Sequence, residues 1–105
     1  MAYVYVLGND ELEKHYKIGC TTGSVENRIK KLQTGNSGDL YVVRLVETDA
    51  PFKLELMLHN RFKERLILNE WYLLEEEHLK EFDKCCEIYK QSLEALKENP
   101  FFKYC

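Results

Sequence analysis

The strongest constraint on the fold is a pair of short segments near the amino terminus that both suit a β-strand. Residues 3–7 read Tyr-Val-Tyr-Val-Leu and residues 16–19 read Tyr-Lys-Ile-Gly, so aromatic and β-branched residues dominate both segments. Between them, residues 8–10 read Gly-Asn-Asp, which is typical of a turn. The sequence therefore predicts a half-buried antiparallel hairpin that carries phenol and amine groups.

The length and composition indicate one globular domain. A chain of 105 residues, 45% hydrophobic and 31% charged, is long enough for one modest core but not for two. It begins without a leader-like segment and contains no run of about 20 apolar residues, so we expect an intracellular, soluble protein, cytoplasmic or nuclear, without membrane contact. The four cysteines lack the spacing of a zinc site or a disulfide framework, and we expect reduced thiols.

The charge distribution leaves room for a nucleic-acid partner. The formal net charge of −3 argues against a generic nucleic-acid binder, which normally has a basic excess. However, residues 1–66 contain ten Lys and Arg against nine Asp and Glu, whereas residues 67–105 contain five against nine. The acidity is thus concentrated near the carboxyl terminus, and a local basic face around residues 28–31 and 61–65 stays compatible with the sequence.

The remaining elements follow from hydrophobic spacing and turn residues. We predict a helix over residues 24–34, a strand over 40–47 beside the hairpin, a helix over 52–64, a connector with a short extended piece over 66–74, and a helix over 76–98. Because residues 40–46 are almost continuously apolar, the third strand is expected to be covered on both faces. The predicted class is α+β, a small three-stranded antiparallel sheet flanked by helices. Residues 1–75 form the core and 76–105 a carboxy-terminal helix of the same domain.

The carboxy-terminal helix has a regular apolar seam with alternating spacings of three and four residues. Two interpretations are open: the helix packs on its own core, or it forms a homodimer or binds a partner protein through residues 76–98. The seam consists of Leu79, Phe82, Cys86, Tyr89, Leu93 and Leu96.

Glu55 stands out because it lies among apolar residues in the middle of the helix predicted over 52–64. A buried carboxylate is costly unless it is paired or binds a cation, so Glu55 is a candidate metal ligand or catalytic group. The alternative is a carboxylate at the edge of the apolar stripe that reaches solvent or pairs with Arg28 or Arg61. His59, one helical turn away, is either a satisfied, partly buried histidine or part of the same site.

In their order and spacing, these residues resemble the GIY-YIG nuclease superfamily, in particular a compact phage- and virus-associated subgroup whose second motif reads Tyr-Lys-Ile-Gly. The resemblance covers about residues 2–75. Residues 3–5 stand at the Gly-Ile-Tyr motif, with Tyr3 in place of the glycine, and residues 17–19 at the Tyr-Ile-Gly motif, with Lys17 in place of the tyrosine. Arg28 matches the helix arginine and Glu55 the metal-binding glutamate. Residues 58–62 and 70–72 are similar to later parts of the pattern.

The resemblance implies a metal-dependent endonuclease that hydrolyses a DNA phosphodiester bond by in-line attack of water, with RNA as the alternative substrate. It implies that Tyr5 is the general base and that Arg28 binds the scissile phosphate. Lys17 would either supply positive charge to Tyr5 or, if burial lowers its own pKa, accept the proton of the phenol. Glu55 would hold one Mg²⁺ or Mn²⁺ ion. Tyr16, His59 and Asn69 are supporting candidates.

The resemblance also leads to a geometric expectation and to an alternative function. Tyr5, Lys17, Arg28 and Glu55 should converge on one concave face of the sheet, with Tyr16 on the opposite face because strand side chains alternate. The alternative is an inactive or weakly active module that keeps the fold and binds nucleic acid or a protein.

Overall fold

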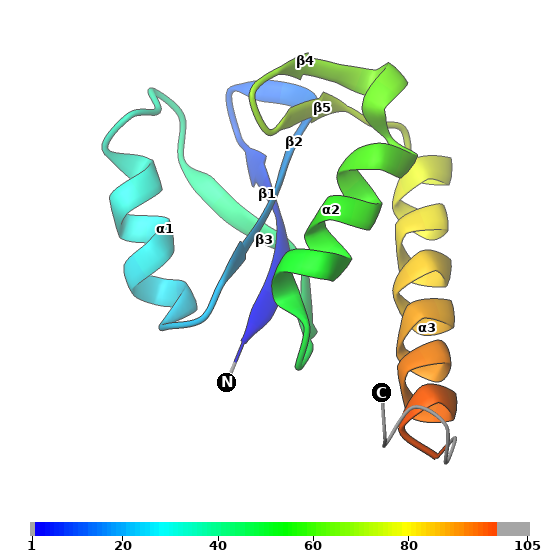
Figure 1. The fold of residues 1–105 in the computed structure, drawn as a ribbon. Helices are drawn as coiled ribbons and strands as arrows, with labels where there is room; N and C mark the ends of the chain where they lie inside the picture. The colour runs from blue at the N-terminus through cyan, green and yellow to red at the C-terminus, as the bar shows by residue number, and fades with distance from the viewer. Residues whose placement is uncertain (1, 99–105) are drawn as a thin grey trace.

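A computed structural model describes residues 2–98 of the chain, with side chains through residue 92 (Figure 1). Its elements in chain order are β1 (Tyr3–Asn9), β2 (Leu12–Thr21), α1 (Val25–Gln33), β3 (Leu40–Glu47), α2 (Pro51–Arg61), a 3-10 turn (Lys63–Arg65), β4 (Leu66–Leu68), β5 (Trp71–Leu73) and α3 (Glu76–Glu98). The bounds of β3 and α3 agree with the predicted ranges. Pro51 occupies the first turn of α2, where its missing N–H leaves no helical hydrogen bond unmade.

The sheet has five antiparallel strands in the order β3-β1-β2-β5-β4, so the prediction of three strands was wrong. Residues 66–74 form a hairpin rather than a connector with one extended piece. Its strand β5 pairs with the outer edge of β2, with Lys17 opposite Trp71. Each strand of this hairpin has only three residues, and strands this short depend on pairing with a larger sheet for their stability.

The register of β1 and β2 places the two motifs side by side. Tyr5 lies opposite Gly19, and Leu7 lies opposite Lys17. Opposite residues of an antiparallel pair point to the same face, and residues two apart on one strand do so too. Tyr5 and Lys17 therefore share one face of the sheet, as predicted.

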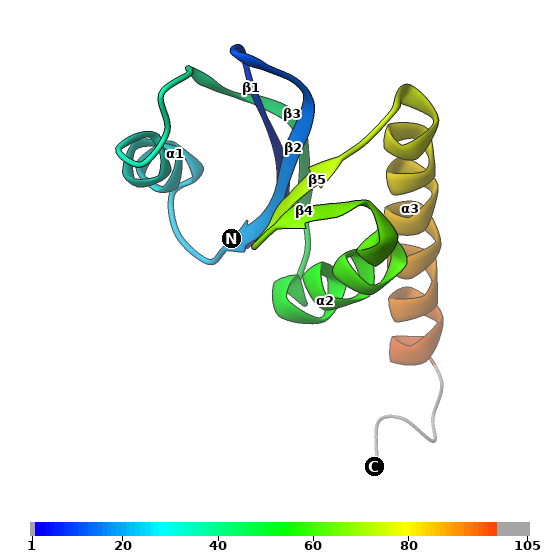
Figure 2. The same cartoon turned by 90° about the horizontal axis from the view of Figure 1, so that it is seen from above.

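The helices cover the two faces unequally (Figures 1 and 2). Helix α1 lies on the face that carries Tyr5, whereas α2 and α3 lie on the opposite face. The main core forms on the α2 and α3 side and consists of Val4, Val6, Ile18, Leu54, Leu58, Phe62, Tyr72, Leu74, Leu79, Phe82 and Cys86. Tyr16 packs against this core, so it points away from Tyr5.

Strand β3 lies beside β1, as expected, but it is an edge strand with incompletely covered faces. Tyr41, Val42 and Leu45 are each 45–48% exposed, so the prediction of a strand covered on both faces was wrong. Its continuous apolar sequence resembles that of a buried strand. The α1 side of the sheet, however, is covered by a single helix of nine residues.

Helix α3 packs on its own domain along the first half of the predicted seam. Leu79, Phe82 and Cys86 are buried in the core, and Tyr89 packs against it. Leu93 and Leu96 lie outside the described side chains. Across the described part of the chain, no helix is long and apolar enough to cross a membrane.

Candidate active site at the edge of the sheet

The centre of the candidate site is the phenol of Tyr5, which lies directly on Gly19. A Cβ atom at Gly19 would be 2.5 Å from the Tyr5 hydroxyl oxygen, so glycine is what allows the ring to lie there. Arg28 of α1 donates a hydrogen bond from Nε to the same hydroxyl oxygen over 3.3 Å. The motif glycine and the helix arginine thus fix the position of one phenol.

The environment of Tyr5 favours the protonated phenol. The residue is 0% exposed, and burial raises the pKa of Tyr5 above its usual value, although the Arg28 guanidinium partly opposes this shift. In return, the hydrogen bond from Arg28 to Tyr5 raises the pKa of the guanidinium, which is charged at every accessible pH. In this conformation the phenol oxygen is covered, and Arg28 is the cationic neighbour that donates a hydrogen bond to it.

Lys17 lies on the same face as Tyr5 but pairs with a different residue. Its ammonium binds Oε2 of Glu70 over 2.8 Å and lies 5.9 Å from the centre of the Trp71 ring. The Lys17 side chain is 11% exposed, so the carboxylate and the indole ring together stabilise a mostly buried charge. In this structure the ammonium of Lys17 pairs with Glu70, and Arg28 is the cation that contacts Tyr5, so a role of Lys17 toward Tyr5 stays a prediction.

The turn between β4 and β5 brings Glu70 to the sheet edge. Asn69 has a φ of 56°, a left-handed conformation that asparagine tolerates better than most residues. The next residue, Glu70, accepts a hydrogen bond at its backbone oxygen from the Ile18 N–H over 3.1 Å. Asn69 thus has a conformational role, and the residue that reaches the site is Glu70.

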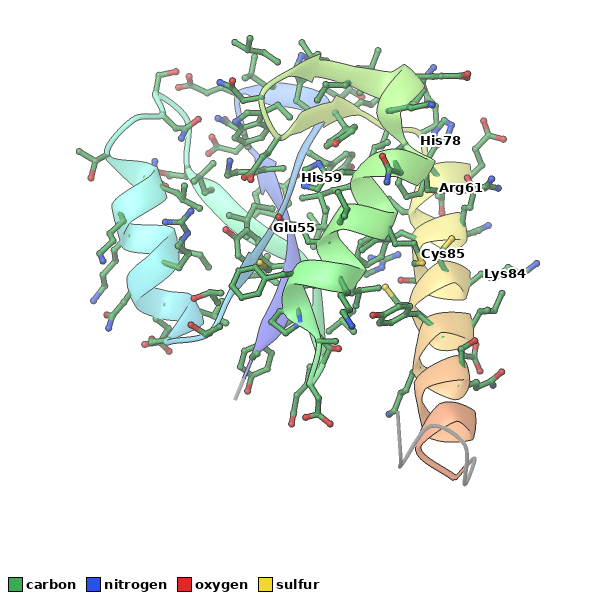
Figure 3. The ribbon with its side chains drawn as sticks, viewed as in Figure 1. Glu55, His59, Arg61, His78, Lys84 and Cys85 are labelled. Atoms are coloured by element: carbon green, nitrogen blue, oxygen red, sulfur yellow. The ribbon has the colours of Figure 1, made fainter. Side chains whose placement is uncertain are left out.

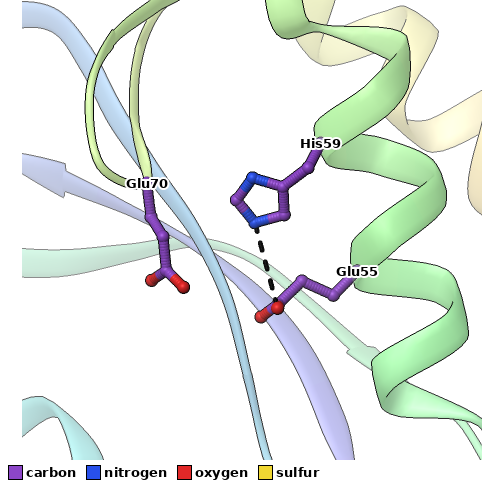
Figure 4. Close-up of side chains that lie close together, drawn as sticks. All are labelled: Glu55, His59 and Glu70. Carbon is purple, nitrogen blue, oxygen red and sulfur yellow. Dashed lines mark ion pairs between the residues drawn. The ribbon is translucent and has the colours of Figure 1, made fainter.

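Glu55 and His59 reach this edge from α2 (Figures 3 and 4). Ligand atoms of Glu55, His59 and Glu70 all lie within 4.8 Å of one another. Nε2 of His59 is 4.0 Å from Oε1 of Glu55, and Nδ1 of His59 forms a hydrogen bond with the Tyr72 hydroxyl. The three side chains could hold a metal ion, since carboxylate oxygens and imidazole nitrogens are common ligands of divalent ions.

The predicted site residues form two groups by the elements that carry them. Tyr5 and Lys17 share one face of the sheet and Arg28 of α1 contacts Tyr5, whereas Glu55 and His59 belong to α2. Helix α2 packs on the Val4 and Ile18 face, and Cys20 of β2 interacts with both Arg28 and Glu55, so the expectation that all four main residues share one concave face stays a prediction.

Glu70 connects the two groups around the edge of β2. It pairs with Lys17 and belongs to the candidate metal-binding cluster with Glu55 and His59. Its negative charge also acts on Tyr5 and Arg28. Sequence reasoning did not select Glu70. The signal that could have done so is the short turn Asn69-Glu70 between two apolar triplets.

Neither arginine that was considered as a partner for Glu55 takes that role. Arg28 binds Tyr5, and Arg61 pairs with Glu81 of α3. Cys20 is instead a close neighbour of Glu55, and burial, together with the Glu55 carboxylate, raises the pKa of the Cys20 thiol to about 12. A thiol in this setting is protonated and inert at neutral pH.

Comparison with known protein families identifies the family of the chain. The T5orf172 domain, a phage-associated domain related to nuclease-like folds, matches residues 2–90. This match extends past residue 75 and includes the part of α3 whose side chains enter the core. Searches of curated proteins and of solved structures found no match to the chain.

Proposed function

The chain belongs to the T5orf172 domain family, and we propose that it is a metal-dependent endonuclease that hydrolyses DNA phosphodiester bonds. The observation that carries the proposal is the contact of Arg28 with Tyr5 over Gly19, beside a cluster of two carboxylates and an imidazole. A guanidinium, a phenol and a candidate metal site within one small region suit phosphoryl transfer. The order of these residues supports assignment to the GIY-YIG superfamily.

Arg28 is the phosphate-binding residue in this proposal. It lies on the exposed helix α1 and is only partly buried, so its guanidinium can turn toward a bound phosphate. Its planar, permanently charged group can donate two parallel hydrogen bonds to non-bridging oxygens and stabilise the charge of the transition state. Lys30 and Lys31 in the last turn of the same helix add positive charge along the path of the DNA backbone.

Tyr5 acts as the general base after Arg28 has moved to the phosphate. This movement exposes the phenol oxygen to solvent, to which the ionised fraction of the phenol has lost its proton, and the resulting phenolate takes a proton from the attacking water. Because burial raises the pKa of Tyr5, only a small fraction of the phenol is ionised at neutral pH, and the rate should increase with pH. Tyr5 is held close to Gly19 throughout, so the oxygen keeps its direction.

Glu55 would hold one Mg²⁺ or Mn²⁺ ion, which supplies positive charge for the leaving 3′-oxygen when bound. Lys17 keeps Glu70 in position at the sheet edge and adds a positive charge beside the site. Asn69 shapes the turn that carries Glu70, and Tyr16 contributes to the core instead of the site.

One observation favours the alternative of a binding module without cleavage: the phenol of Tyr5 is fully buried and already hydrogen-bonded. If Arg28 does not leave Tyr5 when DNA binds, the proposed base never meets water. In that case α1 would bind the DNA backbone while the sheet acts only as a scaffold.

Incubation of supercoiled plasmid with Mg²⁺ or Mn²⁺ separates the two functions. The wild-type protein should nick the plasmid, and Tyr5→Phe, Arg28→Ala and Glu55→Gln should each lower the rate by about 100-fold or more. Tyr41→Phe and Glu47→Gln, at exposed positions of β3, are matched controls and should cleave like the wild type. DNA binding without metal-dependent cleavage would establish the alternative, and cleavage undiminished by all three changes would place the activity elsewhere.

A further inference from the structure

We infer that the metal ion of the proposed nuclease is held by three side chains, Glu55, His59 and Glu70, and that this site prefers Mn²⁺ to Mg²⁺. The inference rests on the proposed function for its biological meaning, but it concerns metal binding by the protein without DNA. It replaces a single carboxylate with a mixed site of two carboxylates and one imidazole.

The spacing of the three residues is close to what a bound ion needs. Their ligand atoms lie within 4.8 Å of one another. Ligands about 2.1 Å from one ion lie roughly 3 to 4 Å apart, so each side chain has to move by about 1 Å or less. Glu55 and His59 are one helical turn apart on α2 and already point to the same place (Figure 4).

His59 provides the observation that points to a ligand. Its Nε2 atom is buried and lacks a hydrogen-bond partner among the described residues. Buried polar atoms are nearly always paired, so an unpaired ring nitrogen that faces a carboxylate at 4.0 Å needs an explanation. That distance is too long for a hydrogen bond but leaves room for an atom that both groups bind.

Tyr72 fixes the imidazole in an orientation suited to this role. The Tyr72 hydroxyl is hydrogen-bonded to Nδ1 of His59. When Nδ1–H donates to the hydroxyl oxygen, Nε2 presents its lone pair toward Glu55 and Glu70. Metal-binding histidines are typically held by such a contact to the second nitrogen. Tyr72 is therefore a positioning residue.

Glu70 can bind the ion while it stays paired with Lys17. The ammonium of Lys17 binds Oε2 of Glu70, so the second carboxylate oxygen can bind an ion. Lys17 also holds the Glu70 carboxylate near the two residues of α2 before any ion arrives. The site therefore contains two carboxylates and one ammonium, and its net negative charge attracts a divalent cation.

The imidazole determines which ion is favoured. Mg²⁺ is bound by oxygen ligands and retains several waters, whereas an imidazole nitrogen improves the affinity for first-row transition ions. We therefore expect Mn²⁺ to bind at least 10-fold more tightly than Mg²⁺. His59→Asn should reduce Mn²⁺ affinity by 10-fold or more and change Mg²⁺ affinity much less, so that the preference is largely lost.

Calorimetric titration of the full chain with MnCl₂ and with MgCl₂, without DNA, tests the inference. Glu55→Gln, His59→Asn and Glu70→Gln should each weaken Mn²⁺ binding by 10-fold or more, and Tyr72→Phe should weaken it to a smaller extent. His15→Asn and Glu47→Gln are the matched controls and should bind like the wild type. Circular dichroism verifies that each variant is folded.

A measurement on the wild-type protein tests the same metal site without any substituted variant. Substoichiometric Mn²⁺ should broaden the amide NMR signals of Glu55, His59 and Glu70 before those of Lys30 and Lys31. Loss of binding only in Glu55→Gln, or broadening confined to acidic surface residues elsewhere, would overturn the three-ligand site. Plasmid cleavage by the His59→Asn and Glu70→Gln proteins at the wild-type rate would leave the nuclease proposal intact and remove only this inference.

Discussion

Replacing Gly19 with alanine places a methyl group against the ring of Tyr5. The added Cβ would lie 2.5 Å from the Tyr5 hydroxyl oxygen, 2.7 Å from Cζ and 2.8 Å from Cε1. Favourable contacts between carbon atoms are about 3.5 to 4.0 Å, so the ring has to move by about 1 Å. Tyr5 is 0% exposed, and this movement therefore disturbs its buried neighbours and the hydrogen bond from Arg28.

The expected loss of stability follows from two opposing terms. Overpacking a buried site destabilises the protein by about 1 to 3 kcal/mol. Alanine also lowers the conformational entropy of the unfolded chain, which stabilises the folded state by roughly 0.4 to 1 kcal/mol. With the middle of each range, the net destabilisation is about 1.3 kcal/mol. With a urea dependence of about 1 kcal/mol per molar for a chain of this size, the unfolding midpoint should fall by roughly 1.3 M. A shift of 1 Å at the phenol should also reduce cleavage by about 100-fold.

Gly23→Ala is the matched control for this experiment. Among the described residues other than its two chain neighbours, the nearest atom to a Cβ at Gly23 is Oγ1 of Thr21, at 4.0 Å, so the methyl group fits. This variant should keep or slightly raise the urea midpoint and should cleave DNA at the wild-type rate. Equal midpoints and equal cleavage rates for both variants would refute the close packing of Tyr5 on Gly19 and, with it, the positioning of the proposed base.

Three further predictions follow from the same contacts. Because burial raises the pKa of Tyr5 and a base must be deprotonated, the single-turnover cleavage rate should rise about tenfold per pH unit from about pH 7 to 9.5. Tyr5→Phe should abolish this pH dependence, and a plateau of the wild-type rate in this range would exclude Tyr5 as the base. In a double-mutant cycle of Lys17→Met and Glu70→Gln, urea unfolding should give a coupling free energy of about 1 to 2 kcal/mol, because the lysine is mostly buried while the glutamate stays accessible to water. Strictly additive effects of the two substitutions on stability would contradict the pairing. Asn69→Gly should keep the stability and the Mn²⁺ affinity of the wild type. Asn69→Val should lower the free energy of unfolding by about 1 to 2 kcal/mol and bind Mn²⁺ more weakly, since valine disfavours a φ of 56°. Equal behaviour of the two variants would refute the role of the turn.

The parts of the fold that could be predicted from the sequence are those with a clear period or clear end signals. Residues 40–47 and 76–98 have both, and the structure forms β3 and α3 over these residues. The alternation of strand side chains also predicted that Tyr5 and Lys17 share a face. These properties depend on local geometry, which a single sequence records directly.

The parts that could not be predicted depend on pairing between distant residues. The hairpin of β4 and β5 forms because β5 pairs with the outer edge of β2, and two strands of three residues carry almost no local signal for this. The pairing of Lys17 with Glu70 joins residues 53 positions apart. Likewise, the sequence places Glu55 on a helix but does not determine which face of the sheet that helix covers.

The most direct measurement of the central claim is the analysis of cleaved DNA ends after a single turnover in ¹⁸O-labelled water with Mn²⁺. In-line attack of water with loss of the 3′-oxygen predicts one ¹⁸O atom in the new 5′-phosphate and an unlabelled 3′-hydroxyl, as read by mass spectrometry of the product strands. Uncut DNA, label at the 3′ end, or a 5′-phosphate without ¹⁸O would contradict hydrolysis by water at this site.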